Sequence, residues 1–295
     1  MNRIAVIQMA APWGLPDPMR ERTFRLLHEA AARGATLAVL PELCTISYDF
    51  HARGDIDPRA ESLDGPSVIG WAAIARETGM HIVAGFPERA ADERPAGGRV
   101  GDRLYNSAVV IGPAGVIGTY RKAHLYHFER DIFTPGDGGF QVWDTPPGRV
   151  GVLICYDLRF AEAVRLLLLR GAQILCVPTT WTDRGKPEAW DARGWCGADY
   201  LAAGHAYGNR LWVACANRAG MDGTVRTLGC SAIFAPSGLV AAGPATPTGD
   251  QVLVADLDVA RVDARRATPE MDLVRDRRPE LYGDLAKATL VERGG

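Results

Sequence analysis

The 295-residue sequence lacks several features that would point to particular protein classes. Its formal net charge is only −2 and its Lys and Arg residues are scattered, so it has no electrostatic footprint for nucleic acid. Its longest apolar stretches are interrupted by Arg165 and Arg170, so none is expected to cross a bilayer. The first residues show neither the apolar core nor the cleavage site of a signal peptide. These absences predict a cytoplasmic protein that binds neither nucleic acid nor membrane.

Three kinds of site motif are also missing. The six cysteines include no C-x-x-C pair, which argues against a disulfide scaffold or a zinc ribbon and predicts reduced thiols, with Cys176, Cys215 and Cys230 in the apolar core. No Gly-x-Ser-x-Gly elbow is present for a serine triad, and no Gly-x-Gly-x-x-Gly follows a strand, which disfavours a nucleotide-binding module. His124 and His127 have no third ligand nearby in the sequence. We therefore expect neither a metal nor an organic cofactor.

The most informative stretch is residues 149–162, an apolar run that stops at Cys155. A continuous Val/Leu/Ile run is typical of a parallel strand covered on both faces, and residues 161–170 then have the periodicity of a helix. Cys155 is thus predicted at the C-terminal end of a strand, the edge where open α/β sheets bind ligands. A lone cysteine is more often a core residue, so its context decides between the two roles.

The two halves of the chain repeat one order of elements. Strands predicted at 3–9 and 149–155 are each followed by a helix and then by a strand that ends in a proline, Pro41 or Pro178. Each half continues with a helix, which we expect at about 186–204 in the second half, then a strand and a hairpin. Two such halves can bury their sheets against each other. The sequence therefore predicts an α/β fold, a four-layer α-β-β-α sandwich with pseudo-two-fold internal symmetry.

One shared core implies one domain, which we place at residues 1–257. Residues 258–295 are charged, rich in Arg, Asp and Pro, and show no core pattern. We expect this C-terminal tail to pack on the domain or on a partner subunit.

Two charged residues follow other predicted strands. Glu42 comes directly after Pro41, and Lys122 opens an aromatic loop after a hairpin. Either residue alone is more often an exposed surface charge. Together with Cys155, however, they supply the nucleophile, the proton shuttle and the positive donor that cleavage of an amide needs. A nearby lysine would also favour the thiolate form of the cysteine.

At these positions the sequence resembles the nitrilase superfamily of carbon-nitrogen hydrolases, and the resemblance covers nearly the whole chain. It rests on Leu40-Pro41-Glu42, on Tyr120-Arg121-Lys122-x-His124-Leu125, and on Ile154-Cys155-Tyr156-Asp157-Leu158-Arg159-Phe160-x-Glu162. The resemblance implies Glu42 as general base and acid, Lys122 as electrostatic stabiliser, and Cys155 as nucleophile. It also implies the four-layer fold that the repeated halves suggest on their own.

The resemblance further implies a set of substrate-positioning residues, namely Glu129, Tyr156, Arg159, Thr179 and Trp181. Glu129 would be the family's second glutamate and would position the substrate or Lys122. Tyr156 would offer its backbone N–H to the oxyanion. Arg159 suits a substrate carboxylate, whereas an ion pair with Glu162 or another acid is the alternative.

The predicted function is hydrolysis of the C–N bond of a small linear amide, through a cysteine thioester and with release of ammonia. The sequence Tyr156-Asp157 stands where relatives that act on nitriles typically have Trp-Glu, which favours amides. The alternative is an N-carbamoyl amine or N-carbamoyl amino acid amidohydrolase. A nitrilase is less favoured, and so is a catalytically silent interaction protein, because Glu42, Lys122 and Cys155 are all present. Ala161, where many relatives have proline, departs from the pattern without touching the chemistry. The resemblance also suggests a homodimer or higher homo-oligomer, formed through the tail and the helix after Cys155.

Overall fold

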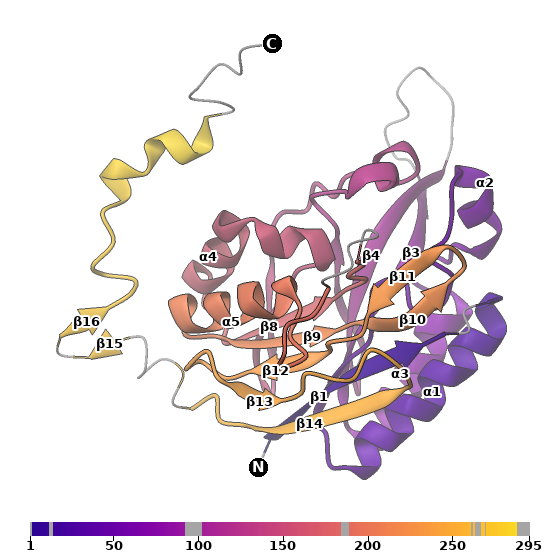
Figure 1. Cartoon of the computed structure of the whole chain (residues 1–295), viewed down its shortest axis with the longest axis horizontal. Helices are drawn as coiled ribbons and strands as arrows, with labels where there is room; N and C mark the ends of the chain where they lie inside the picture. Colours follow the sequence, from indigo (N-terminus) through magenta and orange to yellow (C-terminus); the bar gives the residue numbers. More distant parts are fainter. Residues whose placement is uncertain are drawn as a thin grey trace.

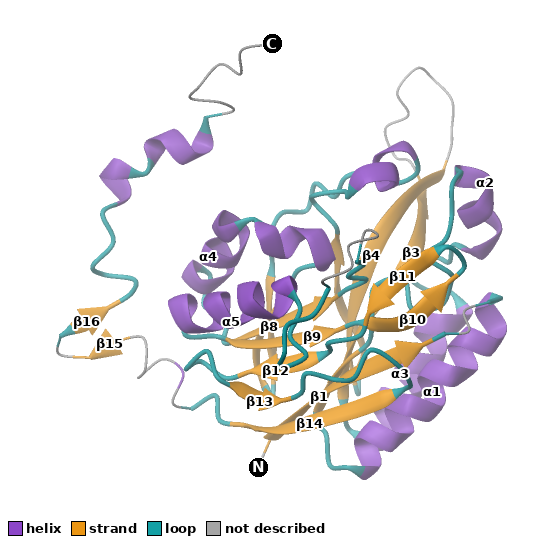
Figure 2. Cartoon of the chain, in the orientation of Figure 1, coloured by secondary structure: helices purple, strands orange, loops and turns teal. Residues whose placement is uncertain are grey.

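The computed structural model describes residues 2–11, 14–91, 102–183, 189–260, 262, 267–268 and 270–287. Within these ranges the chain forms two large mixed sheets that face each other and carry helices on their outer faces (Figures 1 and 2).

The first sheet has eight strands and contains both ends of the folded domain. Its strands are β1 (Asn2–Ala10), β2 (Leu37–Val39), β3 (His81–Ala91), β4 (Asp102–Gly112), β5 (Gly115–Arg121), β10 (Arg218–Asp222), β11 (Val225–Leu228) and β14 (Gln251–Leu257). The order is β11-β10-β1-β2-β3-β4-β5, and β14 pairs antiparallel with β1. Strands β1, β2 and β3 are parallel, whereas β4 and β5 add antiparallel ladders.

The second sheet has six strands in the order β13-β12-β9-β8-β7-β6. They are β6 (Val142–Thr145), β7 (Gly148–Val152), β8 (Ile174–Pro178), β9 (Trp212–Ala216), β12 (Ala232–Phe234) and β13 (Val240–Ala242). Strands β7, β8 and β9 are parallel, and β12 and β13 follow antiparallel. The run β7-β8-β9-β12-β13 thus repeats the run β1-β2-β3-β4-β5, which confirms the predicted internal symmetry.

Four longer helices form the outer layers. They are α1 (Pro16–Ala32) and α3 (Pro66–Thr78) on the first sheet, and α4 (Ala161–Leu169) and α5 (Gly197–Asn209) on the second. Helix α3 begins at a proline and ends at Gly79, whose φ of 73° is the left-handed conformation that glycine adopts easily at a helix end. A shorter helix, α2 (Arg53–Ile56), leads into the 3₁₀ turn η1 (Asp57–Arg59).

The sequence predicted a helix at about 186–204, and the predicted start of this helix is wrong. Helix α5 begins at Gly197, and residues 184–188 lie outside the described part of the chain. The carboxylate of Asp191 accepts the N–H groups of Arg193 and Trp195, which builds a turn there instead of a helix. Asp199 then accepts the N–H of Cys196 and starts α5.

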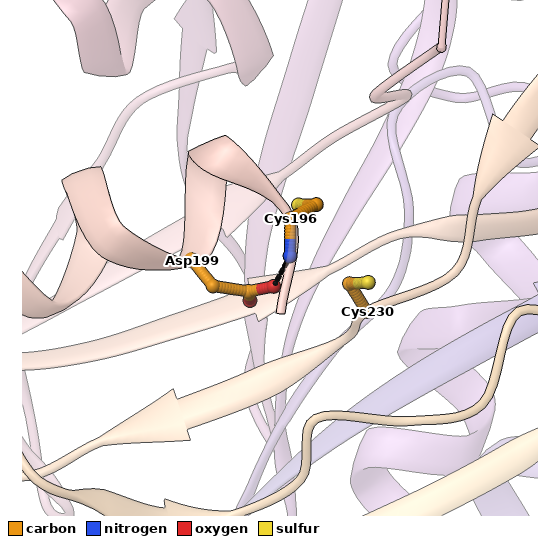
Figure 3. Close-up of side chains that lie close together, drawn as sticks. All are labelled: Cys196, Asp199 and Cys230. Carbon is orange, nitrogen blue, oxygen red and sulfur yellow. Dashed lines mark hydrogen bonds between the residues drawn. The ribbon is translucent and has the colours of Figure 1, made fainter. Parts of the chain in front are cut away.

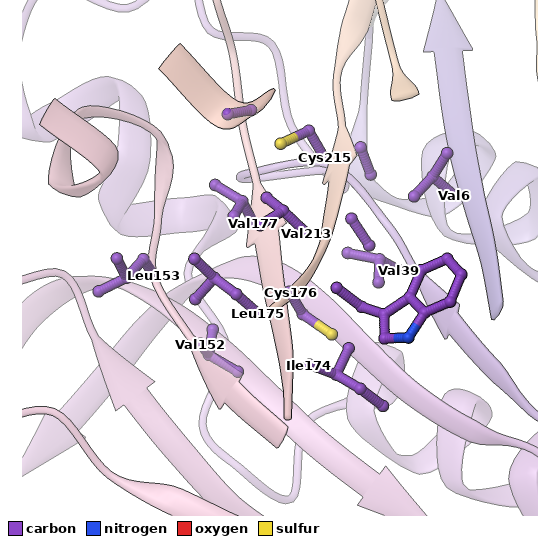
Figure 4. Packing of buried hydrophobic residues seen from close by; sticks show 14 of the residues in the cluster. Val6, Val39, Val152, Leu153, Ile174, Leu175, Cys176, Val177, Val213 and Cys215 are labelled. Carbon is purple, nitrogen blue, oxygen red and sulfur yellow. The ribbon is translucent and has the colours of Figure 1, made fainter. Parts of the chain in front are cut away.

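The main core lies between the two sheets and beneath the helices of the second sheet. Figure 4 shows side chains of both sheets packed together, among them Val6 and Val39 from the first sheet and Val152, Ile174 and Val213 from the second, all fully buried. Cys176 and Cys215 lie among them, as expected for small apolar residues. A second cluster, around Trp71, joins α1 and α3 to the outer face of the first sheet.

The C-terminal segment runs away from both sheets in Figure 1. After β14 ends at Leu257, the chain forms the short strands β15 (Ala267–Thr268) and β16 (Met271–Asp272) and the 3₁₀ turns η4 (Pro279–Leu281) and η5 (Gly283–Ala286). Across the described ranges, no helix is both long enough and apolar enough to span a bilayer.

Candidate active site

The candidate catalytic residues lie where strands of the two sheets end. Glu42 follows β2, Lys122 follows β5 directly, and Cys155 comes three residues after the last residue of β7. Strand β2 is parallel to β3, and β4 and β5 each pair antiparallel with the strand before them, so β5 runs in the same direction as β2. The three residues therefore belong to carboxyl-end connections, the edge where α/β sheets carry their ligands.

The sequence predicted Cys155 at the end of a strand, and this placement is wrong. Strand β7 stops at Val152, and Cys155 begins the 3₁₀ turn η3 (Cys155–Arg159). Its φ of 47° is left-handed, which is uncommon for a residue with a side chain. Such conformations persist only where the surroundings hold them, and they concentrate at functional sites.

Lys122 is the centre of a buried charge cluster. Its Nζ lies 2.6 Å from Glu42 Oε1 and 2.9 and 2.8 Å from the two carboxylate oxygens of Glu129. The side chains of all three residues are fully buried. Glu129 sits in the 3₁₀ turn η2 (His127–Asp131), which the loop after β5 forms. The structure thus brings together the lysine and both glutamates that the sequence singled out.

Burial and charge act in opposite directions on this cluster. Burial alone would lower the pKa of Lys122, but the carboxylates of Glu129 and Glu42 more than offset it and hold the pKa above its usual value. Burial raises the pKa of Glu129, Lys122 counteracts this, and the charge of Glu42 adds to the rise. The lysine therefore stays a fixed positive charge at the base of the site.

The two oxygens of Glu42 have different roles in this arrangement. Oε1 accepts hydrogen bonds from Lys122 Nζ and from Asn106 Nδ2, the latter at 2.8 Å. Oε2 is buried and has no hydrogen-bond partner among the residues that the structure describes. A buried carboxylate oxygen without a partner is costly, so this atom has room for one further hydrogen bond.

Two further residues of the cluster were missed by the sequence analysis. Tyr48 donates its hydroxyl to Glu129 Oε1 at 2.6 Å, and Asn106 donates to Glu42 and, at 3.2 Å, to Glu129. Asn106 lies on β4, and its carbonyl accepts the backbone N–H of Lys122. Asn106 reaches the cluster through the pairing of β4 with β5, and Tyr48 reaches it from the loop after β2. Neither contact is visible in the sequence.

The thiol of Cys155 is protonated at rest. Burial, followed by the charge of Glu42, raises the pKa of Cys155 to about 12, and Lys122 offsets only part of the rise. Lys122 lowers this pKa, as expected of a nearby lysine, but desolvation and the charge of Glu42 outweigh its effect. The Sγ atom donates to the carbonyl of Thr180 at 3.7 Å.

A pocket of ≈ 340 Å³ opens above the thiol. Tyr126, Cys155, Tyr156, Arg159, Trp181 and the first turn of α5 are among its walls. Its size suits a small molecule, and Glu42 and Lys122 lie behind its floor rather than on its surface. Tyr156, Arg159 and Trp181 thus lie where the sequence placed them, whereas Thr179 is buried beside the thiol and is not a wall residue.

Arg159 is exposed in this pocket. It makes no hydrogen bond or ion pair with any residue of the described ranges, so the alternative pairing with Glu162 does not occur there. The other charged wall residue, Asp183, pairs with Arg226 at 3.4 Å. The guanidinium of Arg159 is therefore available to a ligand.

Asp157 joins the turn η3, which begins at Cys155, to the loop that begins at Lys122. Its Oδ2 accepts from the Tyr120 hydroxyl at 2.8 Å and from the N–H of Ile154 at 3.1 Å. Its Oδ1 accepts the backbone N–H of His124 at 2.9 Å and faces the His124 ring nitrogen at 2.7 Å. One buried carboxylate thereby fixes Cys155 relative to Lys122.

A fully buried arginine supports Glu42 from the other side. Arg218 donates to the backbone carbonyls of Glu42, at 2.9 and 3.2 Å, and of Leu43. It also pairs with Asp222 at 3.0 Å, and Asp222 accepts the N–H of Tyr48. Leu43 has a left-handed φ of 47°, so this pair holds a strained turn in place.

Comparison with known proteins agrees with this site. The family model described as carbon-nitrogen hydrolase matches residues 3–267. A nitrilase of Pyrococcus abyssi is 35% identical over 96% of this chain and 99% of its own, and a citrullinase of Francisella tularensis is 32% identical over 97% and 98%. A mutant amidase from Nesterenkonia sp. AN1, solved after Michael addition of acrylamide at its active-site cysteine, superposes with a TM-score of 0.76 at 25% identity, covering 97% of this chain and 100% of that one. The chain belongs to the carbon-nitrogen hydrolase family, the nitrilase superfamily, and is a hydrolase that acts on amides.

Proposed function

We propose that the protein hydrolyses a small linear amide through a thioester on Cys155 and releases ammonia. The observation that carries the proposal is the different bonding of the two Glu42 oxygens: Lys122 and Asn106 hold Oε1, whereas the buried Oε2 bonds to none of the described residues. A carboxylate in this state is positioned by one oxygen and reactive at the other. It lies close enough to the Cys155 thiol for its charge to raise that pKa.

In the first half-reaction Cys155 attacks the amide carbonyl while Glu42 Oε2 takes the thiol proton. The pKa of about 12 makes this transfer necessary, because at neutral pH almost no thiolate is present beforehand. Lys122 and the backbone N–H of Tyr156 stabilise the oxyanion. The first hydrogen bond of η3 runs from Asp157 N to Ile154 O, so the N–H of Tyr156 is not used within the turn.

Protonated Glu42 then donates to the leaving amine, which departs as ammonia and completes the first half-reaction. In the second half-reaction Glu42 takes a proton from water, whose oxygen attacks the thioester carbonyl. Glu42 returns this proton to the departing sulfur, which restores the thiol. Glu129 keeps Lys122 oriented through both steps by accepting two of its N–H bonds.

The test is ammonia release from a panel of ω-amides, N-carbamoyl amines, N-carbamoyl amino acids and nitriles. We expect turnover of at least one amide or carbamoyl class that is lost in Cys155→Ala. Faster turnover of nitriles than of every amide would contradict the amide assignment, which matters because one relative is named a nitrilase.

Arg159 favours a second candidate, an N-carbamoyl amino acid amidohydrolase. A guanidinium that lines a ligand pocket and bonds to none of the described residues suits a carboxylate at the far end of the substrate. Arg159→Gln should then raise KM for an N-carbamoyl amino acid about tenfold or more and leave KM for the matching N-carbamoyl amine unchanged. Equal effects on both compounds would contradict carboxylate recognition.

We also propose that residues 1–257 form the hydrolase domain and that the tail from Asp258 packs with α4 in a homodimer. In the tail, Leu281 and Leu285 are 64% and 66% exposed. The tail also lies near α4: burial lowers the pKa of Arg165 on α4, and the charge of Arg277 in the tail lowers it further. Light scattering should give about twice the 31.8 kDa of one chain, and Leu281→Asp with Leu285→Asp should reduce it. Leu239→Asp, on the turn between β12 and β13, is the matched control. A wild-type mass of one chain at micromolar concentration would contradict the dimer.

A further inference from the structure

Two thiols and a carboxylate that the proposed reaction does not use lie together behind the wall of the substrate pocket. Figure 3 shows Cys196 and Asp199 at the start of α5, with Cys230 on the neighbouring segment that leads into β12. Cys230 was expected to be a simple core residue. Its Sγ, the Sγ of Cys196 and a carboxylate oxygen of Asp199 all lie within 4.8 Å of one another, and all three residues are buried.

The spacing of these three atoms suits one small cation. Zinc is bound at about 2.3 Å by thiolates and at about 2.0–2.2 Å by carboxylate oxygens. Two donors on a tetrahedral ion are therefore roughly 3.5–4 Å apart. Small side-chain rotations from separations below 4.8 Å reach this geometry.

The carboxylate gives an independent reason to expect a positive ligand. Asp199 is fully buried, and its Oδ2 accepts the N–H of Cys196 at 2.9 Å. Within the described residues, its Oδ1 is buried without a hydrogen-bond partner and Asp199 forms no ion pair, so the two thiols are the polar side chains that face this carboxylate. A carboxylate in this environment is satisfied by a cation.

Contacts on the outer side of the two sulfurs would orient them toward an ion. Trp190 donates its indole N–H to Cys230 Sγ at 3.1 Å, the type of outer contact that orients a sulfur ligand. Cys196 is the residue before α5, where the positive end of the helix dipole favours negative charge. The carbonyl oxygen of Gly194, 3.5 Å from Cys230 Sγ, is a candidate for the fourth ligand.

We propose that Cys196, Asp199 and Cys230 bind a divalent cation of the zinc class. Two sulfur ligands select for zinc over magnesium or calcium, which prefer oxygen. The role is structural, because the cation would tie the start of α5 to the segment before β12. Gly197, Ala198 and Leu228, which flank the cluster in sequence, line the substrate pocket, so the bound ion would stabilise that wall.

The test uses full-length Cys155→Ala protein, so that the proposed nucleophile cannot compete for metal. After treatment with a chelator, titration with Cd²⁺ alone should produce a cadmium–thiolate charge-transfer band that saturates at about one equivalent. Cys196→Ala and Cys230→Ala should abolish the band. Asp199→Asn, which keeps an acceptor for the N–H of Cys196, should weaken binding at least about tenfold. Cys215→Ala, a buried thiol outside the cluster, is the matched control and should bind as the parent does.

Two measurements keep the proposal testable if the cluster variants do not fold. X-ray absorption of the zinc-loaded Cys155→Ala protein should show two sulfurs at about 2.3 Å and oxygen at about 2.0 Å. Calorimetry in buffers of different ionisation enthalpy should show proton release on zinc binding, because the thiols must deprotonate. A shell of nitrogen and oxygen alone, unchanged Cd²⁺ binding in Cys196→Ala, or a Cys196–Cys230 disulfide in freshly purified protein would overturn it. None of these readouts depends on amide turnover, so they stand apart from the proposed function.

Discussion

Replacing Glu42 by glutamine should change how the reactivity of Cys155 depends on pH. Glutamine can still accept from Lys122 and Asn106 through its oxygen, but it puts an amide nitrogen where the free Oε2 now lies. With a pKa of about 12, forming the Cys155 thiolate by proton loss to water near pH 7 costs about five pKa units, or about 7 kcal/mol. In the wild type, Glu42 takes the proton as the sulfur attacks, so no free thiolate has to form and no proton leaves the site before the attack.

The assay is iodoacetamide modification of Cys155, followed by peptide mapping. The wild-type rate should be nearly constant between about pH 6 and pH 8, whereas the Glu42→Gln rate should rise about tenfold per pH unit, because thiolate must then form by proton loss to solvent. Loss of the Glu42 charge also lowers the thiol pKa, so about 7 kcal/mol is an upper bound for the variant. Ammonia release should fall between about 10² and 10⁴-fold.

Glu129→Gln is the matched control for this experiment. It removes a carboxylate charge from the same side of Lys122 but leaves Glu42 Oε2 in place, so its labelling profile should stay flat. A Glu42→Gln profile as flat as the wild type, or a Glu129→Gln profile as steep as that of Glu42→Gln, would refute the assignment of Glu42 as proton acceptor. Labelling should be confined to Cys155, because it is 9% exposed and the other cysteines are at most 1% exposed.

Three further predictions follow from the contacts around the site. Lys122→Met should lower kcat about 10² to 10³-fold and also lower Tm, since it leaves two buried carboxylates facing each other; adding Glu129→Gln should recover part of the Tm in calorimetry but none of the turnover. Arg218→Lys should reduce kcat about tenfold or more with little change in KM, because lysine cannot bond both the Glu42 carbonyl and Asp222, and Arg218 does not line the pocket; a change confined to KM would contradict a positioning role. Burial lowers the pKa of His205 in the folded protein. The stability that His205 contributes is therefore present above the ordinary histidine pKa of about 6.5 and is lost as pH falls through the folded-state pKa. His205→Gln should flatten this part of a curve of Tm against pH, whereas His28→Gln, at an exposed position, should not.

The elements that the sequence predicted well are those with a strong local pattern. Helix α3 was expected from Gly65-Pro66 to Thr78 and occurs at Pro66–Thr78, because a proline start, an apolar face and a terminal glycine agree. The parallel strands were recognised as apolar runs, and their repeated order was enough to predict two facing sheets. Strand β14, Gln-Val-Leu-Val-Ala-Asp-Leu, is also an apolar run, but its place beside β1 was not predicted, because its partner lies some 250 positions earlier and only tertiary structure joins them.

The candidate site shows the same limit at the level of single residues. Glu42, Lys122, Glu129 and Cys155 stand in recognisable motifs, so their proximity could be predicted. The hydrogen bonds from Tyr48 and Asn106 could not, since each residue stands in an unremarkable strand or loop sequence. The sign of the pKa shift at Cys155 also escaped prediction, because a sequence shows which charges are near but not how far water is excluded.

The bonds that Asp157 makes to Tyr120 and His124 join the two repeats of the chain, the first of which carries Glu42 and Lys122 and the second Cys155. Neither repeat holds the complete set of reacting groups. During refolding, the helices and strands of each repeat can therefore form before activity returns. The rate at which ammonia release recovers then reports the docking of one repeat on the other, not the folding of either repeat. A backbone cut at the turn between β6 and β7, around residues 146–147, would leave two fragments that are each inactive and that regain activity only on reassociation.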